Sequence, residues 1–143
     1  MTLVANSDLD IQIIDKCVKD SGYATKFEGD NSIYVSDSQL DFPCWIDLLS
    51  DLYAIKISTY IEFKKDVNET EALNFVNNAC MSVVFPSFYI ANDNPSGALR
   101  MYSCYFIDVE NGLESAYLMK SMVRFIGAFS WSLTLDDEDH FFQ

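Results

Sequence analysis

Carboxylates are the most frequent side chains in this sequence that could do chemistry. Six acids between Glu28 and Asp51 occur with no lysine or arginine among them: Glu28, Asp30, Asp37, Asp41, Asp47 and Asp51. Paired acids serve general acid–base catalysis, and calcium sites need several oxygen ligands. The run lacks the spacing of an EF-hand, and its acids fall at expected turns and exposed strand positions. We therefore interpret it as solvated loops, with a divalent-metal or small-ligand sensor as the alternative.

The sequence contains no pattern typical of nucleophilic catalysis or of zinc binding. The one histidine, His140, lies in an acidic tail that we expect to fray, whereas a Ser-His-Asp or Cys-His device needs a rigidly held base. The four cysteines are widely separated without a CxxC pair, which is typical of small core residues. Glycine-rich phosphate-binding motifs are also missing from the sequence. The sequence predicts no catalytic residues, no metal, no cofactor and no enzymatic activity.

The charge balance narrows the possible partners. Twenty-two acids against nine bases give a net charge of −13, and no basic patch is visible, which argues against nucleic-acid and anionic-membrane binding. Neither a signal peptide nor an apolar run of membrane-spanning length is evident, so we expect a cytoplasmic protein. The acidic surface leaves a second alternative function open, an immunity-type partner that neutralises a basic protein.

The element around which we expect the chain to be organised is a long helix over residues 111–135. Asn111 is a favourable N-cap, and Glu114 follows three positions later, close to a capping box. The helix should end near Leu135. Apolar residues recur behind Asn111 at spacings of three and four and form one broad face: Leu118, Met122, Phe125, Ile126, Phe129 and Leu133.

The remaining elements follow from changes of period along the chain. Ser7 and Asp10 mark the start of a first helix that ends at Gly22, and Asn68 with Glu71 marks the second helix. Strand-like alternation fills the segments between. The prediction is a single α+β domain over residues 1–143, an antiparallel sheet of about five strands with three helices, in the order α-β-β-β-β-α-β-β-α. We expect one sheet face to be wet, and residues 1–6 and 136–143 to fray.

Two groups of side chains stand out as candidate partner or dimer surfaces. On the long helix, a mixed aromatic and basic stripe lies roughly opposite the apolar face, and it consists of Tyr117, Lys120, Arg124 and Trp131. Tyr60 and Tyr102 point to the outer face of the sheet, which suits strand or helix addition by a partner.

Residues 71–129 resemble the YbjN family, which is related in fold to the type III secretion chaperones. The similarity lies in ALNFVNNACMSVVFPSFYI and LRMYSCYFIDVENGLESAYLMKSMVRFIGAF, with Asn74, Asn77, Phe85, Gly112 and Phe125 as matched positions. The resemblance implies a helix-flanked antiparallel sheet, without catalytic residues, that binds other proteins. Secretion chaperones of this type dimerise and hold extended clients. We therefore expect a chaperone-like or regulatory homodimer that acts on a protein client.

Overall fold

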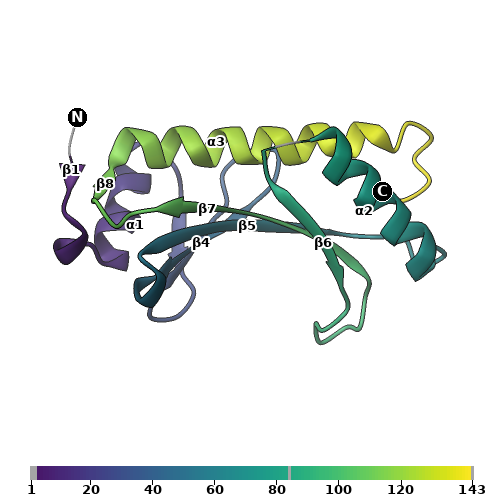
Figure 1. The fold of residues 1–143 in the computed structure, drawn as a ribbon, viewed down its shortest axis with the longest axis horizontal. Helices are drawn as coiled ribbons and strands as arrows, with labels where there is room; N and C mark the ends of the chain where they lie inside the picture. Colours follow the sequence, from purple (N-terminus) through teal and green to yellow (C-terminus); the bar gives the residue numbers. More distant parts are fainter. Residues whose placement is uncertain (1–2, 84, 143) are drawn as a thin grey trace.

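A six-stranded antiparallel sheet forms the centre of the computed structural model, which describes residues 3–83 and 85–142 (Figure 1). Its strands lie in the order β2-β3-β4-β5-β7-β6. Their bounds are Thr25–Phe27 for β2, Ser32–Val35 for β3, Cys44–Leu49 for β4, Ala54–Glu62 for β5, Ser87–Ala91 for β6 and Arg100–Asp108 for β7. Every neighbouring pair is antiparallel, which confirms the predicted α+β class.

The three helices lie on one face of this sheet. They are α1 at Ile11–Asp20, α2 at Glu69–Ser82 and α3 at Ser115–Ser132. Helix α3 runs along the whole sheet, with α1 at one end and α2 at the other (Figure 1). The predicted order α-β-β-β-β-α-β-β-α is confirmed for the three helices and the strands of the main sheet. The sequence could predict this order because hydrophobic periodicity is a local signal within each segment.

Local capping explains where two of the helices begin. The Asp10 side chain accepts a hydrogen bond from the Ile13 amide at 2.9 Å, so α1 starts after Asp10. Asn68 and Glu71 form the predicted capping box of α2, with the Glu71 amide donating to Asn68 Oδ1 at 2.9 Å and the Asn68 amide to Glu71 Oε1 at 3.2 Å. Each cap satisfies amides that the first helical turn leaves free.

The core between the helices and the sheet has two parts. One lies under α1 and the first half of α3, where Ile14, Ile46, Ile57 and Met122 are fully buried. The other lies under α2 and the second half of α3 and is rich in phenylalanine: Phe63, Phe75, Phe88, Phe129 and Phe142. Alternation in β5 confirms the predicted sidedness, since Ile55, Ile57 and Thr59 are buried while Lys56 and Tyr60 are partly exposed.

The prediction that α3 starts behind an Asn111 cap is wrong. Gly112 adopts a φ of +100°, and Leu113–Glu114 form a short strand, β8, that pairs with Leu3–Val4, β1. A Cβ atom on Gly112 would lie 2.7 Å from the Val4 carbonyl oxygen, so only glycine permits this approach. The pairing holds residues 113 and 114 extended, and α3 therefore begins at Ser115. It also fixes residues 3 and 4, which we had expected to fray.

The strand count is also larger than predicted. The main sheet contains six strands, and β1 and β8 add a separate two-stranded pair, where about five strands were expected. The strand that follows α2 is short, because α2 continues to Ser82 and β6 starts only at Ser87, after Pro86. Residue 84 lies outside the described residues.

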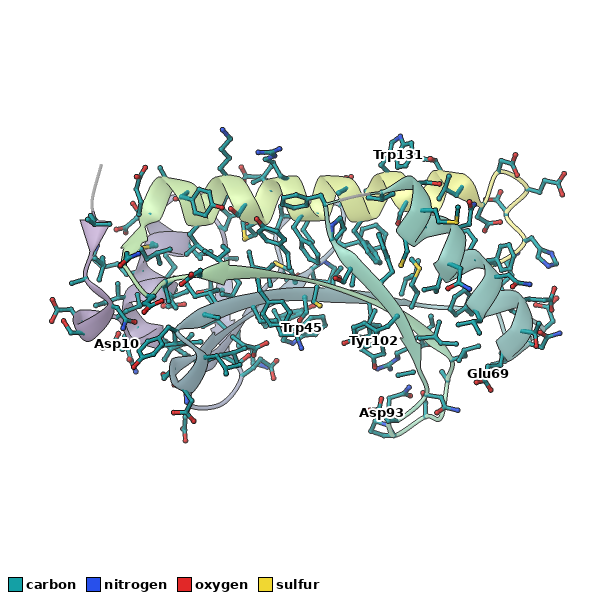
Figure 2. All side chains as sticks on the ribbon, viewed as in Figure 1. Asp10, Trp45, Glu69, Asp93, Tyr102 and Trp131 are labelled. Carbon is teal, nitrogen blue, oxygen red and sulfur yellow. The ribbon has the colours of Figure 1, made fainter. Side chains whose placement is uncertain are left out.

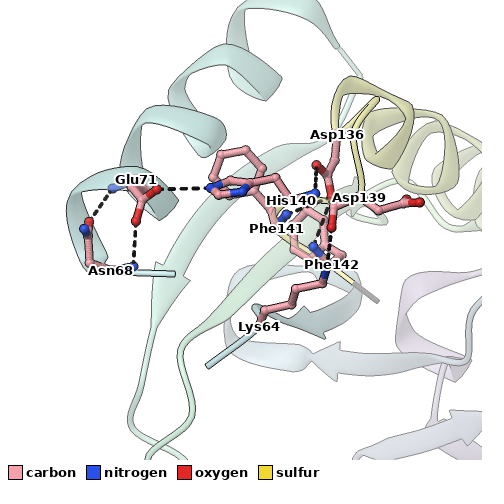
Figure 3. A network of polar contacts seen from close by, with 8 residues as sticks. All are labelled: Lys64, Asn68, Glu71, Asp136, Asp139, His140, Phe141 and Phe142. Carbon is pink, nitrogen blue, oxygen red and sulfur yellow. Dashed lines mark hydrogen bonds and ion pairs between the residues drawn. The ribbon is translucent and has the colours of Figure 1, made fainter. Parts of the chain in front are cut away.

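The acidic tail folds back onto the domain, contrary to our expectation of fraying at 136–143. The Asp136 carboxylate accepts hydrogen bonds from the amides of His140, Phe141 and Phe142, at 2.7, 3.0 and 3.0 Å (Figure 3). Phe142 is only 5% exposed, and its ring lies 4.8 Å from that of Phe63. The predicted helix end near Leu135 does agree with the structure, because a 3-10 turn at Leu133–Leu135 follows α3. Residue 143 is not described.

Candidate protein-binding surface

The sheet face turned away from the helices carries a row of aromatic side chains. Alternate residues of each strand point to this face, and Figure 2 shows Trp45 and Tyr102 projecting from the sheet on the side opposite to α3. The helices α1, α2 and α3 lie on the other side of the sheet (Figure 1). We call this side the open sheet face.

The row crosses five strands in strand order: Tyr34 on β3, Trp45 on β4, Tyr60 on β5, Tyr102 on β7 and Tyr89 on β6. Ring centroids of successive members are 4.9, 5.5, 5.4 and 5.3 Å apart. These distances lie within the range of favourable aromatic pairs. The row is therefore a continuous, preformed apolar surface whose tyrosines also offer hydroxyl groups.

Strand register brings together Tyr60 and Tyr102, which the sequence had predicted as an outer-face pair; the two are directly paired across β5 and β7. Sequence reasoning missed Tyr34, Trp45 and Tyr89. The alternation of Tyr34 between Ile33 and Val35 indicated its face, but only the register between strands places it beside Trp45. Tyr89 is the most exposed of the row, at 41%, and partial burial raises its pKa.

Charges on the open sheet face are balanced. The strand residues that point to this face include three bases, Lys26, Lys56 and Arg100, and three acids, Asp47, Glu62 and Asp108. Arg100 lies 4.1 Å from the Tyr60 ring centroid and donates to Glu62 Oε1 at 2.9 Å. The net charge of these strand residues is thus zero, whereas that of the whole chain is −13. The acidic excess lies elsewhere on the molecule.

The predicted stripe on α3 is on the other side of the sheet. Tyr117 and Trp131 are 49% and 52% exposed, and Figure 2 shows Trp131 pointing away from the sheet. The Arg124 guanidinium lies 5.5 Å from the Phe85 ring, which in turn stacks on Tyr105 at 4.3 Å. Hydrogen bonding by the Tyr117 hydroxyl is the main cause that raises the pKa of Tyr105. The six predicted residues therefore divide between two separate surfaces.

The acidic run between Glu28 and Asp51 does not converge. The Asp37 carboxylate accepts hydrogen bonds from the amides of Ala24 and Gln39, which lower its pKa, and Asp47 lies beside Lys56 in the sheet. Across residues 3–83 and 85–142, no three histidine, cysteine, aspartate or glutamate side chains gather closely enough to hold a metal ion. The other four acids of the run, Glu28, Asp30, Asp41 and Asp51, are exposed.

His140 and the cysteines have structural surroundings. His140 Nε2 lies 3.2 Å from Glu71 Oε2, and this contact is the main reason that the pKa of Glu71 is lowered (Figure 3). Cys44 is fully buried, which raises its pKa to about 12, whereas Cys80 is exposed at the end of α2 rather than part of the core. In the part of the chain that the structure describes, no helix has the length and apolar character of a membrane span.

This chain has an antiparallel sheet with one face covered by helices and one face open, and its helices come before, between and after the strands. This arrangement is the fold class shared by YbjN and the type III secretion chaperones. The crystal structure of YbjN from E. coli matches with a TM-score of 0.76 and 13% identity over 98% of each chain. An uncharacterized protein from Methanothermobacter thermautotrophicus matches with a TM-score of 0.66 and 15% identity, over 92% of this chain and 99% of its own.

A chain in the structure of the HopA1–SchA chaperone–effector complex has a TM-score of 0.55 at 16% identity, covering 85% of this chain and 88% of that one. No protein-family model and no curated protein matches the sequence. The resemblance predicted from residues 71–129 is thereby confirmed as a likeness of fold.

Proposed function

We propose that this chain is a non-enzymatic protein-binding module, chaperone-like or regulatory, that acts as a homodimer on a protein client in the cytoplasm. The observation that carries the proposal is the open sheet face with its five-ring aromatic row and balanced charge. Aromatic residues are enriched where proteins contact one another, and they supply much of the binding energy there. The fold shared with a chain of a chaperone–effector complex agrees with such a role.

The open sheet face suits an apolar and aromatic contact more than a charge-driven one. A partner that neutralises the protein by charge would bind where the acids are in excess, and such binding weakens steeply with salt. A client held by Tyr34, Trp45, Tyr60, Tyr102 and Tyr89 should be retained when the salt concentration rises. Salt resistance of a captured client therefore separates the proposed function from that of an acidic immunity-type partner.

The chain offers a matched pair of tryptophans for the decisive experiment. Trp45 lies in the aromatic row, while Trp131 lies on α3 beyond the opposite face of the sheet. Tagged wild type, Trp45→Ala and Trp131→Ala would each be used to capture proteins from the native cells, after circular dichroism has shown that all three are folded.

A client retained by wild type and Trp131→Ala in high salt, and lost by Trp45→Ala, is the expected result. Loss in Trp131→Ala alone would place the client on the predicted stripe of Tyr117, Lys120, Arg124 and Trp131 instead. Equal capture by all three proteins would contradict a client site on either surface.

A further inference from the structure

The tail, residues 136–142, returns from the end of α3 to α2 and lies against residues that come from elsewhere in the chain (Figure 1). These residues are Phe63 and Lys64, directly after β5, and Glu71 and Phe75 on α2. We call these four residues the tail site. Other contacts hold it in place, because the Phe63 amide donates to the Leu99 carbonyl at 2.9 Å and the capping box fixes the first turn of α2.

The backbone of the tail is bound by groups that would bind any peptide. The Lys64 amide donates to the Phe141 carbonyl at 2.8 Å, and the Lys64 ammonium donates to the Asp139 carbonyl (Figure 3). Both acceptors are main-chain oxygens. Peptide recognition commonly takes its affinity from such main-chain bonds and its specificity from pockets for side chains.

Two aromatic rings supply the side-chain part of the contact. The Phe142 ring lies 4.8 Å from Phe63 and 5.1 Å from Phe75, and the Phe141 ring lies 4.9 Å from Phe75. Phe142 is buried and Phe141 is partly buried. The tail site therefore selects a segment with two consecutive aromatic side chains.

The link between α3 and the tail site opposes docking of the tail. Residues 136–139 are four acids that follow a helix with no basic residue in its last turn, and a helix C-terminus is itself negative. Among the described residues, Asp137 and Glu138 have no ion-pair partner. Asp139 adopts a φ of +50°, a left-handed conformation that is less favourable for a residue with a Cβ atom than for glycine. A separate peptide with the same two rings is free of these costs.

Charge at the tail site favours a basic ligand. His140 Nε2 of the tail lies 3.2 Å from Glu71 Oε2, and Glu69 adds a second acid in the same turn of α2. A lysine or arginine at the place of His140 would carry a full charge at neutral pH and would pair more strongly with the Glu71 carboxylate. The net charge of −13 also attracts a cationic peptide.

Space for a ligand longer than the tail adjoins the site. A hollow of about 480 Å³ shares Phe63 and Lys64 with the tail site and is also lined by Lys65 and residues 96–99. None of the described tail residues lines this hollow.

We infer that the tail site is a second peptide-binding site, for a segment with a basic residue followed by two aromatic residues, and that the tail occupies it as an intramolecular competitor. The apparent affinity of an external peptide is then reduced by the fraction of molecules whose tail is docked. The tail site lies on the helix-covered side of the sheet, whereas Trp45 lies on the open sheet face. Either site can therefore fail while the other stands.

Fluorescence anisotropy of a labelled peptide with Lys-Phe-Phe at its centre tests the inference. Wild type should bind the peptide weakly. Phe142→Ala removes a ring of the tail and Asp136→Ala removes the acceptor of three tail amides, so each should bind the peptide about tenfold more tightly or more. Two variants keep the comparison available if one of them does not fold. Trp45→Ala should bind as wild type does.

Two further peptides serve as controls. A peptide with Lys-Ala-Ala at its centre should not bind. A peptide with Gln-Phe-Phe should bind less tightly than the one with Lys-Phe-Phe, and Glu71→Gln should remove this difference because it removes the charge that faces the lysine.

Hydrogen exchange locates the bound peptide. Saturation of wild type with the Lys-Phe-Phe peptide should speed exchange of the Phe141 and Phe142 amides, because the released tail is exposed to solvent. No binding to the folded tail variants, or affinities equal to that of wild type, would overturn the inference. Binding that leaves the tail amides protected would also overturn it and would place the peptide on another surface, namely the open sheet face if Trp45→Ala abolishes it.

Discussion

Replacing Phe142 by alanine tests whether the acidic tail is part of the folded domain. The Phe142 ring lies 4.8 Å from Phe63 and 5.1 Å from Phe75, and it is 5% exposed although it stands next to the last residue of the printed sequence. A frayed tail would contribute almost nothing to stability. The observed packing instead makes this ring part of the second core.

The expected loss follows from two limiting outcomes. If the tail stays in place, a cavity remains, and a buried phenylalanine truncated to alanine costs about 3–5 kcal/mol. If the tail detaches, the protein loses about 1.5–3 kcal/mol for the ring itself and also exposes part of Phe63 and Phe75. The molecule takes the cheaper outcome, so we expect a loss of about 2–4 kcal/mol in the free energy of unfolding.

Urea denaturation of wild type, Phe142→Ala and the control Phe27→Ala gives the comparison. Phe27 is 45% exposed at the edge strand β2, and its replacement should change stability by no more than about 0.5 kcal/mol. Combining Phe142→Ala with Asp136→Ala should cost less than the sum of the two single losses, because the carboxylate and the ring hold the same segment. A Phe142→Ala variant as stable as Phe27→Ala would refute the packing of the tail.

Two further predictions concern titratable groups. Because the folded state lowers the pKa of Glu71 below its ordinary value of 4.5, chiefly through His140, the contact stabilises the fold above that pH and is lost as the pH falls through the lowered value. Exchange protection of the tail amides should therefore fall on acidification in wild type, and Glu71→Gln should show less of this change; identical profiles would contradict the contact. Among the cysteines, the exposed Cys80 should react quickly with a thiol reagent, whereas Cys44, which is buried and has a pKa of about 12, should react only after unfolding. Rapid labelling that persists in Cys80→Ser would contradict the assignment of the fast reaction to Cys80.

The sequence was sufficient for the order of the elements but not for their ends. Periodicity and caps such as Asn68 act within a few residues, and they placed the start of α2 correctly. The start of α3 depends instead on pairing between Leu113 and Val4, more than one hundred positions apart in the chain. The folded conformation of the tail depends on the contact of His140 with Glu71 and on the hydrogen bond from the Phe142 amide to Asp136. Neither contact could be predicted from a local sequence pattern.

The candidate surfaces show the same division between local and distant information. Alternation predicted that Tyr60 and Tyr102 point to the outer face, and the structure places them together. The position of Trp45 in the aromatic row depends on the register of β4 against β5, and a single sequence does not specify this register. The place of Tyr89 in the row likewise depends on where β6 begins, and therefore on how far α2 continues before Pro86.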